Sequence, residues 1–204
     1  MKLFIFDMGG VVAAGVAVTP AIAAELGISD DDFFRGAGSD PDAKHTSPYH
    51  LGDIAAIMSG TISVEQFWKR FSERTGIAVS GDPWYSHFHP SRDEKTVQLI
   101  KDLQKKGHRV VCGTNTLESH FRRHTELGDY ACFDKVYASQ QMGVIKPDRG
   151  FWDYILKEEK TDAADAFFTD DFEENIEAAR RIGLKAHHFT GADDLRLALK
   201  SYLS

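Results

Sequence analysis

The stretch that decides the fold is FIFDMGG, residues 4–10, in which three large apolar residues lead directly into an aspartate, a methionine and two glycines. A short apolar run that ends in glycines is typical of a buried strand followed by a turn. The strand therefore ends on the carboxylate of Asp7, which makes Asp7 a candidate for chemistry. An acidic helper would be sought close by, but two residues further on there is only Gly9.

Further short apolar runs alternate with helical patterns along the chain. Strands are predicted at Phe4–Phe6, His108–Cys112, Lys135–Ala138, Ala166–Thr169 and Lys185–Phe189. Helices are predicted at Glu94–Lys106, Asp148–Glu159, Glu173–Ile182 and Ala192–Tyr202, where apolar residues recur every three to four positions. This rhythm predicts an α/β fold with a parallel sheet, in a Rossmann-like core of three layers.

The segment from about Ala14 to Pro90 breaks the alternation. It shows helical patterns at Thr19–Leu26 and Val64–Arg74 but no convincing strand, and residues 35–50 have the composition of a long loop. We therefore expect a small helical insert after the first strand, residues 15–90, which would form a domain of its own. The α/β core would then comprise residues 1–14 and 91–204.

Composition narrows the classes of function. The 204 residues carry 24 basic and 31 acidic side chains, a formal net charge of −7, which argues against a nucleic-acid partner. The short apolar start and the absence of a long apolar run predict a cytoplasmic protein without membrane contact. Cys112 and Cys132 lack metal-site spacing and are expected to be buried free thiols. A monomer or a homodimer is expected.

Polar residues follow the ends of several predicted strands. In an open parallel sheet, ligands bind beyond the carboxyl ends of the strands, so such residues should gather in one place. Each of them has an ordinary alternative role, as a helix or turn cap or as a solvated charge. Together they predict a site for phosphate and Mg²⁺. They are Asp7, then Thr114 and Asn115 in VVCGTNT, Lys146 in GVIKPD, and Asp170 and Asp171 in FFTDDFEEN.

Four motifs carry a resemblance to a known family. FDMGGVV, VVCGTNT, GVIKP and FFTDDFEENIEAARRIG, in this order, resemble the four motifs of the haloacid dehalogenase (HAD) superfamily, and the helical insert resembles its cap. Within the superfamily, SQQMGVIKPDRGFW and FTDDFEEN look most like the branch of sugar-phosphate phosphatases that includes α-D-glucose-1-phosphate phosphatase. The resemblance implies a phosphatase that hydrolyses a small phosphorylated metabolite, such as a sugar phosphate, through an aspartyl-phosphate intermediate.

The resemblance also implies a role for each residue of the site. Asp7 matches the family's nucleophile. Thr114 and the backbone amide of Asn115 would bind phosphoryl oxygens, and Gly10 would let the backbone approach the phosphate. Lys146 would offset the negative charge shared by Asp7 and the phosphate.

The same resemblance implies the metal ligands. Mg²⁺ would be held by Asp7, the backbone carbonyl of Gly9, and Asp171, with Asp170 close enough to bind directly or through water. Asn175 matches a polar position of the fourth motif, where a structural role is as good an interpretation as ligation.

The chain departs from the family pattern at Gly9. Most family phosphatases have a second aspartate there, which protonates the leaving oxygen and then activates water. The sugar-phosphate branch is one in which glycine is found at this place, but haloacid dehalogenases also lack that aspartate. A 2-haloacid dehalogenase therefore remains an alternative, as does a non-catalytic phosphate-binding relative.

Substrate choice is expected to lie in the insert, whose long loop could close over the site. Lys44, His45, Tyr49 and His50 are the candidates for contacts to a sugar or a phosphate, and His45 and Tyr49 are predicted as substrate-binding residues. The alternative is that these are simply solvated loop residues.

Overall fold

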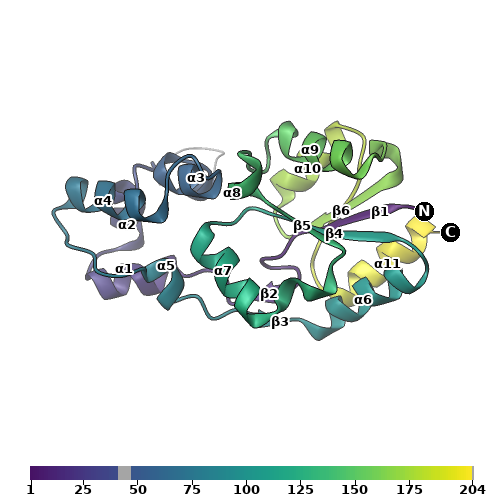
Figure 1. The fold of residues 1–204 in the computed structure, drawn as a ribbon, viewed down its shortest axis with the longest axis horizontal. Coiled ribbons are helices and arrows are strands. Elements are labelled where there is room, and N and C mark those ends of the chain that lie inside the picture. Colours follow the sequence, from purple (N-terminus) through teal and green to yellow (C-terminus); the bar gives the residue numbers. More distant parts are fainter. Residues whose placement is uncertain (41–46, 204) are drawn as a thin grey trace.

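The protein is built on a parallel sheet that places the ends of its strands together. In a computed structural model, which describes residues 1–40 and 47–203, five strands of that range form this sheet in the order β5-β4-β1-β6-β7 (Figure 1). The strands are β1 (Leu3–Phe6), β4 (Arg109–Thr114), β5 (Lys135–Ala138), β6 (Ala166–Asp170) and β7 (Lys185–His188). The predicted α/β fold is confirmed. Strand β4 continues two residues beyond its predicted end, so Thr114 is its last residue.

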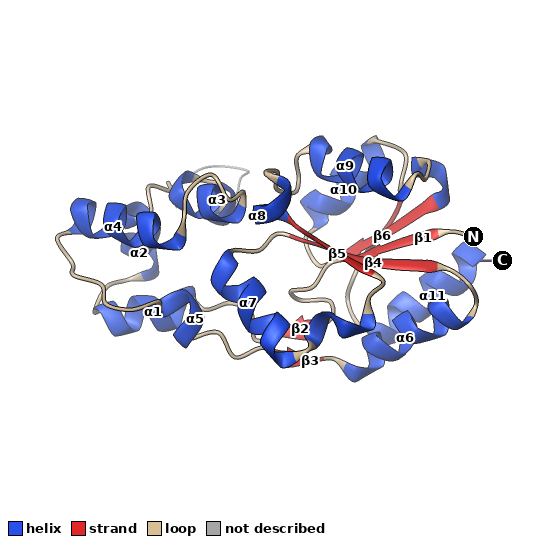
Figure 2. Ribbon diagram, in the orientation of Figure 1, coloured by secondary structure: helices blue, strands red, loops and turns tan. Residues whose placement is uncertain are grey.

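Strand β1 lies at the centre of the sheet and is buried on both faces. Phe4 and Phe6 belong to the apolar cluster that contains α6 (Glu94–Lys105) and α11 (Ala192–Leu203). Leu3 and Ile5 belong to the cluster on the other face, with α9 (Arg149–Glu159) and α10 (Glu173–Arg181). Alternate side chains of a strand point to opposite faces, so an all-apolar β1 suits a sheet covered on both sides. Figure 2 shows the resulting three layers.

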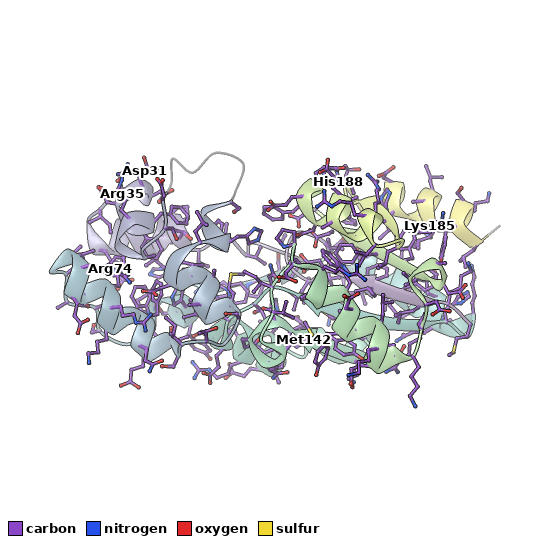
Figure 3. The ribbon with its side chains drawn as sticks, turned by 90° about the horizontal axis from the view of Figure 1, so that it is seen from above. Asp31, Arg35, Arg74, Met142, Lys185 and His188 are labelled. Atoms are coloured by element: carbon purple, nitrogen blue, oxygen red, sulfur yellow. The ribbon has the colours of Figure 1, made fainter. Side chains whose placement is uncertain are left out.

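The segment after β1 forms a separate helical group. It contains α1 (Thr19–Leu26), α2 (Asp30–Gly36), a 3₁₀ turn (Pro48–His50), α3 (Gly52–Met58), α4 (Val64–Thr75) and α5 (Pro83–Ser86). Its apolar core is rich in aromatic rings, among them Phe33, Phe67, Phe71 and Trp84. In Figure 3, Asp31, Arg35 and Arg74 mark this group at one end of the molecule, and Lys185 and His188 mark the sheet at the other. The predicted loop at residues 35–50 is too long at both ends, because α2 continues to Gly36 and the 3₁₀ turn begins at Pro48.

Two short strands connect the two parts. Strand β2 (Ala13–Ala14) pairs in antiparallel fashion with β3 (Ser91–Arg92), so the chain leaves for the helical group and returns from it at the same place. The sequence analysis did not predict this pair, because two residues are too few for an alternating pattern to be recognised. We propose that residues 15–90 form a cap domain on a core of residues 1–14 and 91–204.

The remaining elements belong to the core. They are α7 (Glu118–Leu127), α8 (Ser139–Met142) and the 3₁₀ turns Asp129–Cys132 and Ala163–Asp165. Cys112 and Cys132 are free and buried, as predicted. Among the residues that the structure describes, none lies in a helix of the length and apolarity that crossing a membrane requires.

Candidate active site

The predicted site residues meet at the carboxyl ends of the three central strands. Phe6 pairs with Cys112 of β4 and with Thr169 of β6, so Asp7 follows β1 directly between the two neighbouring strand ends. The Asp7 amide donates a hydrogen bond of 3.0 Å to the Thr169 carbonyl, which continues the β1–β6 ladder by one residue. Asp170 ends β6, and Asp171 is the next residue.

The Lys146 ammonium lies beneath this group of strand ends. The Lys146 side chain is 1% exposed, and its Nζ lies 2.8 Å from Asp7 Oδ1 and 2.6 Å from Asp170 Oδ2. It also donates to the Gly113 carbonyl at 3.2 Å. An ammonium has three donors, so these three acceptors satisfy it. Lys146 therefore acts as a fixed counter-charge for Asp7 and Asp170.

Two asparagines hold the charged groups in place. The Asn115 side chain donates to the Lys146 carbonyl at 2.9 Å and accepts from the Lys146 amide at 2.8 Å. On the other side, Asp170 Oδ1 accepts from the Phe172 amide at 2.8 Å and from Asn175 Nδ2 at 3.0 Å. The side chain of Asn115 thus positions Lys146. The backbone amide of Asn115 remains the group that is predicted to bind phosphate. Asn175 likewise holds Asp170 in place, which agrees with the structural role that was one of the two interpretations of this residue.

Electrostatics in the site favour a bound cation. Burial, together with the neighbouring carboxylates Asp170 and Asp171, raises the pKa of Asp7 to about 7 even though Lys146 acts to lower it. Burial and Asp170 likewise raise the pKa of Asp171 to about 6. Three ionised carboxylates against one ammonium leave two negative charges, which a divalent cation would balance.

The oxygen donors also fit Mg²⁺. Asp7, Asp170 and Asp171 each offer a carboxylate oxygen, and these oxygens lie within 4.8 Å of one another. Asp171 Oδ1 is buried and has no hydrogen-bond partner among the described residues, whereas both oxygens of Asp170 are already bound. Mg²⁺ prefers carboxylate and carbonyl oxygens, so Asp7 and Asp171 are the best candidates for direct ligands. Asp170 is better suited to holding Lys146.

Gly10 makes room for Asp171. A Cβ atom on Gly10 would lie 2.1 Å from Asp171 Oδ2, and the φ of Gly10 is +75°, a conformation that favours glycine. Gly9 differs, because its Cβ would meet only the side chain of Val16, at 3.3 Å. The sequence analysis assigned Gly10 to close approach by the phosphate. The structure shows a further reason for glycine at this position.

A cavity of about 210 Å³ opens from these residues towards the cap. Asp7, Gly9, Thr114, Asn115, Lys146, Asp171 and Asn175 line its core end. Thr114 Oγ1 makes only a long contact, 3.4 Å, to the Asn115 carbonyl, so its hydroxyl is available to a ligand. The cavity is therefore continuous with the predicted phosphate site.

The cap contributes two of the predicted contact residues to this cavity. Tyr49 lines it, with its hydroxyl 2.9 Å from Thr19 Oγ1. His50 also lines it, and its Nδ1 lies 3.1 Å from Glu174 at the start of α10, so it joins the cap to the core. Lys44 and His45 lie outside the described residues, and their roles stay predictions.

The structure adds one residue, His188, that the sequence analysis did not name among the site residues. The Nε2 of His188 lies 2.9 Å from the Asp171 carbonyl, and His188 ends β7. His188 lies at the carboxyl end of the last strand, where polar residues of an open parallel sheet meet ligands, and this position in the sequence could have indicated it.

Known proteins share this arrangement of strands and motifs. A family model for haloacid dehalogenase-like hydrolases matches residues 1–183. The chain belongs to this family of hydrolases. The predicted family is therefore confirmed over most of the chain.

Two curated relatives of this HAD-like hydrolase match over nearly their full lengths. The sesquiterpene phosphatase astK of Aspergillus oryzae is 27% identical over 200 residues, which cover 93% of this chain and 90% of that protein. The D-ribitol-5-phosphate phosphatase of Bacteroides thetaiotaomicron is 24% identical over 219 residues, which cover 100% of this chain and 99% of that protein.

Solved structures of low identity share the fold. A predicted HAD-like family hydrolase from Porphyromonas gingivalis superposes with a TM-score of 0.79 at 21% identity, covering 100% of this chain and 98% of that chain. A HAD family enzyme from Bacteroides thetaiotaomicron, in complex with magnesium and inorganic phosphate, gives a TM-score of 0.70 at 20% identity, with coverage of 92% and 93%.

We predict that the two adjacent glycines respond differently to alanine. Gly10→Ala should lower Mg²⁺ affinity at least about tenfold, because the new methyl group displaces the Asp171 carboxylate. Gly9→Ala should keep most of the affinity, because a small shift of Val16 accommodates it. Calorimetric Mg²⁺ titration of the two variants measures this, with circular dichroism to establish that both fold. Equal affinities would contradict the placement of Asp171.

Proposed function

We propose that the protein is a Mg²⁺-dependent phosphatase that uses Asp7 as its nucleophile. The observation that carries this proposal is the buried Lys146 ammonium 2.8 Å from Asp7, beside the unpartnered oxygen of Asp171. Two full-length relatives are named as phosphatases, and one protein of the same fold was crystallised with magnesium and phosphate, which supports the proposal.

Asp7 and Asp171 would hold the metal, with the Gly9 carbonyl as a further oxygen donor and Asp170 close by. Bound Mg²⁺ would supply positive charge where a phosphate meets these carboxylates. The chain itself supplies Lys146, whose charge opposes the effect of burial and so favours the ionised form of Asp7. Only the ionised carboxylate is a nucleophile.

The reaction then takes two displacements at phosphorus. An Asp7 carboxylate oxygen attacks the phosphorus, and the bond from phosphorus to the ester oxygen breaks with its electron pair on the departing alcohol oxygen, which takes a proton from water. A water oxygen next attacks the aspartyl-phosphate, releasing inorganic phosphate and restoring the Asp7 carboxylate. The Thr114 hydroxyl and the Asn115 amide would donate hydrogen bonds to phosphoryl oxygens in both steps.

The carboxylate cluster also bears on the dehalogenase alternative. Displacement of a halide from carbon needs no metal, so it gives no role to the unpartnered oxygen of Asp171 or to the clustering of three carboxylates. A dehalogenase of the same fold superposes with a TM-score of 0.59 at 12% identity, which shows a shared fold alone. Chloride release from 2-chloropropionate would establish the alternative. Binding of Mg²⁺ and phosphate analogues with no turnover would favour a non-catalytic relative.

We predict that Asp7→Asn lowers the turnover of p-nitrophenyl phosphate by at least about a thousandfold, because an amide is a poor nucleophile. Phosphate release is measured at saturating Mg²⁺, with the melting temperature as a check on folding. The matched control is Asp153→Asn, at an exposed aspartate of α9, which should retain wild-type turnover. EDTA should abolish wild-type activity and Mg²⁺ should restore it. Turnover by Asp7→Asn within tenfold of the wild type would refute the assignment of the nucleophile.

A second prediction concerns the leaving group. Without an acid at position 9, negative charge builds up on the departing oxygen, so the rate should fall as the pKa of the released alcohol rises. Sugar 1-phosphates should then react faster than the matching 6-phosphates at equal binding. Gly9→Asp, which needs only a small shift of Val16, should flatten this dependence by supplying a proton donor.

A series of aryl and alkyl phosphates under single-turnover conditions measures the dependence in both proteins. Gly9→Ala is the control that adds a side chain without an acid. A wild-type rate that is independent of leaving-group pKa, with chemistry rate-limiting, would mean that another group supplies the proton.

A further inference from the structure

The cavity is lined by polar and charged groups at the core end and mainly by apolar side chains towards the cap. Beyond the phosphate end, its walls carry mainly apolar side chains that come from distant parts of the chain. They include Val16, Val18, Ile54, Trp84, Phe88 and Leu117. Most of them belong to the apolar core of the cap, so the cavity is an opening into that core. Phe172, next to Asp171, also lines it, and 47% of this residue is exposed.

Most polar groups on these walls already have partners within the protein. The Tyr49 and Thr19 hydroxyls bind each other at 2.9 Å. The His124 Nδ1 lies 2.7 Å from Asp129 Oδ2. The Thr116 hydroxyl makes a long contact of 3.3 Å to the Leu117 carbonyl, similar to that of Thr114. These groups offer few free donors or acceptors to a ligand.

Two nitrogens on this wall are exceptions. His120 Nε2 and Trp84 Nε1 are buried without a hydrogen-bond partner among the described residues. Burial lowers the pKa of His120 to about 3, so the ring is neutral, and it stacks on Phe88 with ring centroids 3.8 Å apart. A stacked neutral imidazole presents one nitrogen and otherwise contributes to a flat, mostly apolar wall.

A sugar does not suit such a chamber. Each buried hydroxyl that finds no partner loses its hydrogen bonds to water, and a hexose brings several hydroxyls to a wall with two free nitrogens. A hydrocarbon group would instead gain affinity from the same walls. The chemistry of the walls therefore favours an apolar alcohol over the sugar that the family resemblance implied.

We propose that this chamber binds the hydrocarbon part of the substrate, so that the substrates are phosphate esters of hydrophobic alcohols. The proposal rests on the phosphatase function proposed above and specifies its substrate class. Asp7, Thr114 and Lys146 would receive the phosphate at the core end, and the cap would enclose the apolar chain. Phe172 would contact the chain at the rim of the cavity.

Primary alkyl phosphates of increasing length test the proposal, with glucose 6-phosphate as the polar comparison. All of these release a primary alcohol, so differences in leaving-group chemistry are small. We expect kcat/KM to rise by up to about fourfold for each buried methylene until the chamber is filled. The longer alkyl phosphates should exceed glucose 6-phosphate by at least about a hundredfold.

A pair of methionine variants tests the location. Met58 at the end of α3 lines the cavity and is partly buried, so Met58→Gln should reduce the ratio of decyl to ethyl phosphate kcat/KM about tenfold. Met142 at the end of α8 is also partly buried but packs in the core on the α9–α10 face. Met142→Gln should leave the ratio unchanged. Calorimetric binding of decyl and ethyl phosphonates to the Asp7→Asn protein gives the same comparison without turnover.

Three results would count against the proposal, and they can be told apart. A flat alkyl series with faster hydrolysis of glucose 6-phosphate would reject the substrate class and leave the phosphatase function intact. No Mg²⁺-dependent hydrolysis of any ester, p-nitrophenyl phosphate included, would reject both. Equal loss of chain-length preference in the two methionine variants would reject the chamber as its source.

Discussion

The rest of the site depends on one buried positive charge. The Lys146 ammonium is enclosed by Asp7, Asp170 and the Gly113 carbonyl, and each of these groups stands at or beside the end of a central strand. Removing one partner from a buried ion pair typically costs about 3–5 kcal/mol, because the other charge stays buried without compensation. The Lys146 charge therefore ties β1, β4 and β6 together at the edge of the sheet where we propose that the chemistry takes place. It also leaves Asp7 facing the cavity with its second oxygen not held by Lys146.

In the proposed function, the core carries out the chemistry and the cap selects the substrate. The core supplies carboxylates, a hydroxyl and backbone amides, which suit a phosphate and a divalent cation whatever alcohol is attached. The cap supplies apolar walls, and His50 joins it to the core through Glu174. The cap also meets the core through the β2–β3 ribbon and through pairs between α5 and α7, such as Tyr85 with Glu126.

The site residues at the strand ends could be predicted from the sequence better than the residues that line the cavity. Asp7, Lys146 and Asp171 could be found because a parallel sheet brings the carboxyl ends of its strands together, whatever the details of packing. The pairing of Tyr49 with Thr19 could not be found, since it depends on how two cap segments meet. Neither could the wall shared by Val16, Trp84 and Leu117, because apolar spacing shows which residues are buried but not which of them face the same space. The role of Asn115 was predicted for its backbone, while its side chain proved to hold Lys146.

The central claim is that Asp7 receives the phosphoryl group at a site shared with Mg²⁺. A crystal structure of the protein soaked with Mg²⁺ and beryllofluoride, a mimic of the phosphoryl group, tests it most directly. We expect beryllofluoride bonded to a carboxylate oxygen of Asp7, near the Thr114 hydroxyl, with Mg²⁺ contacting both Asp7 and Asp171. Beryllofluoride on a different residue, or Mg²⁺ bound without Asp171, would contradict it.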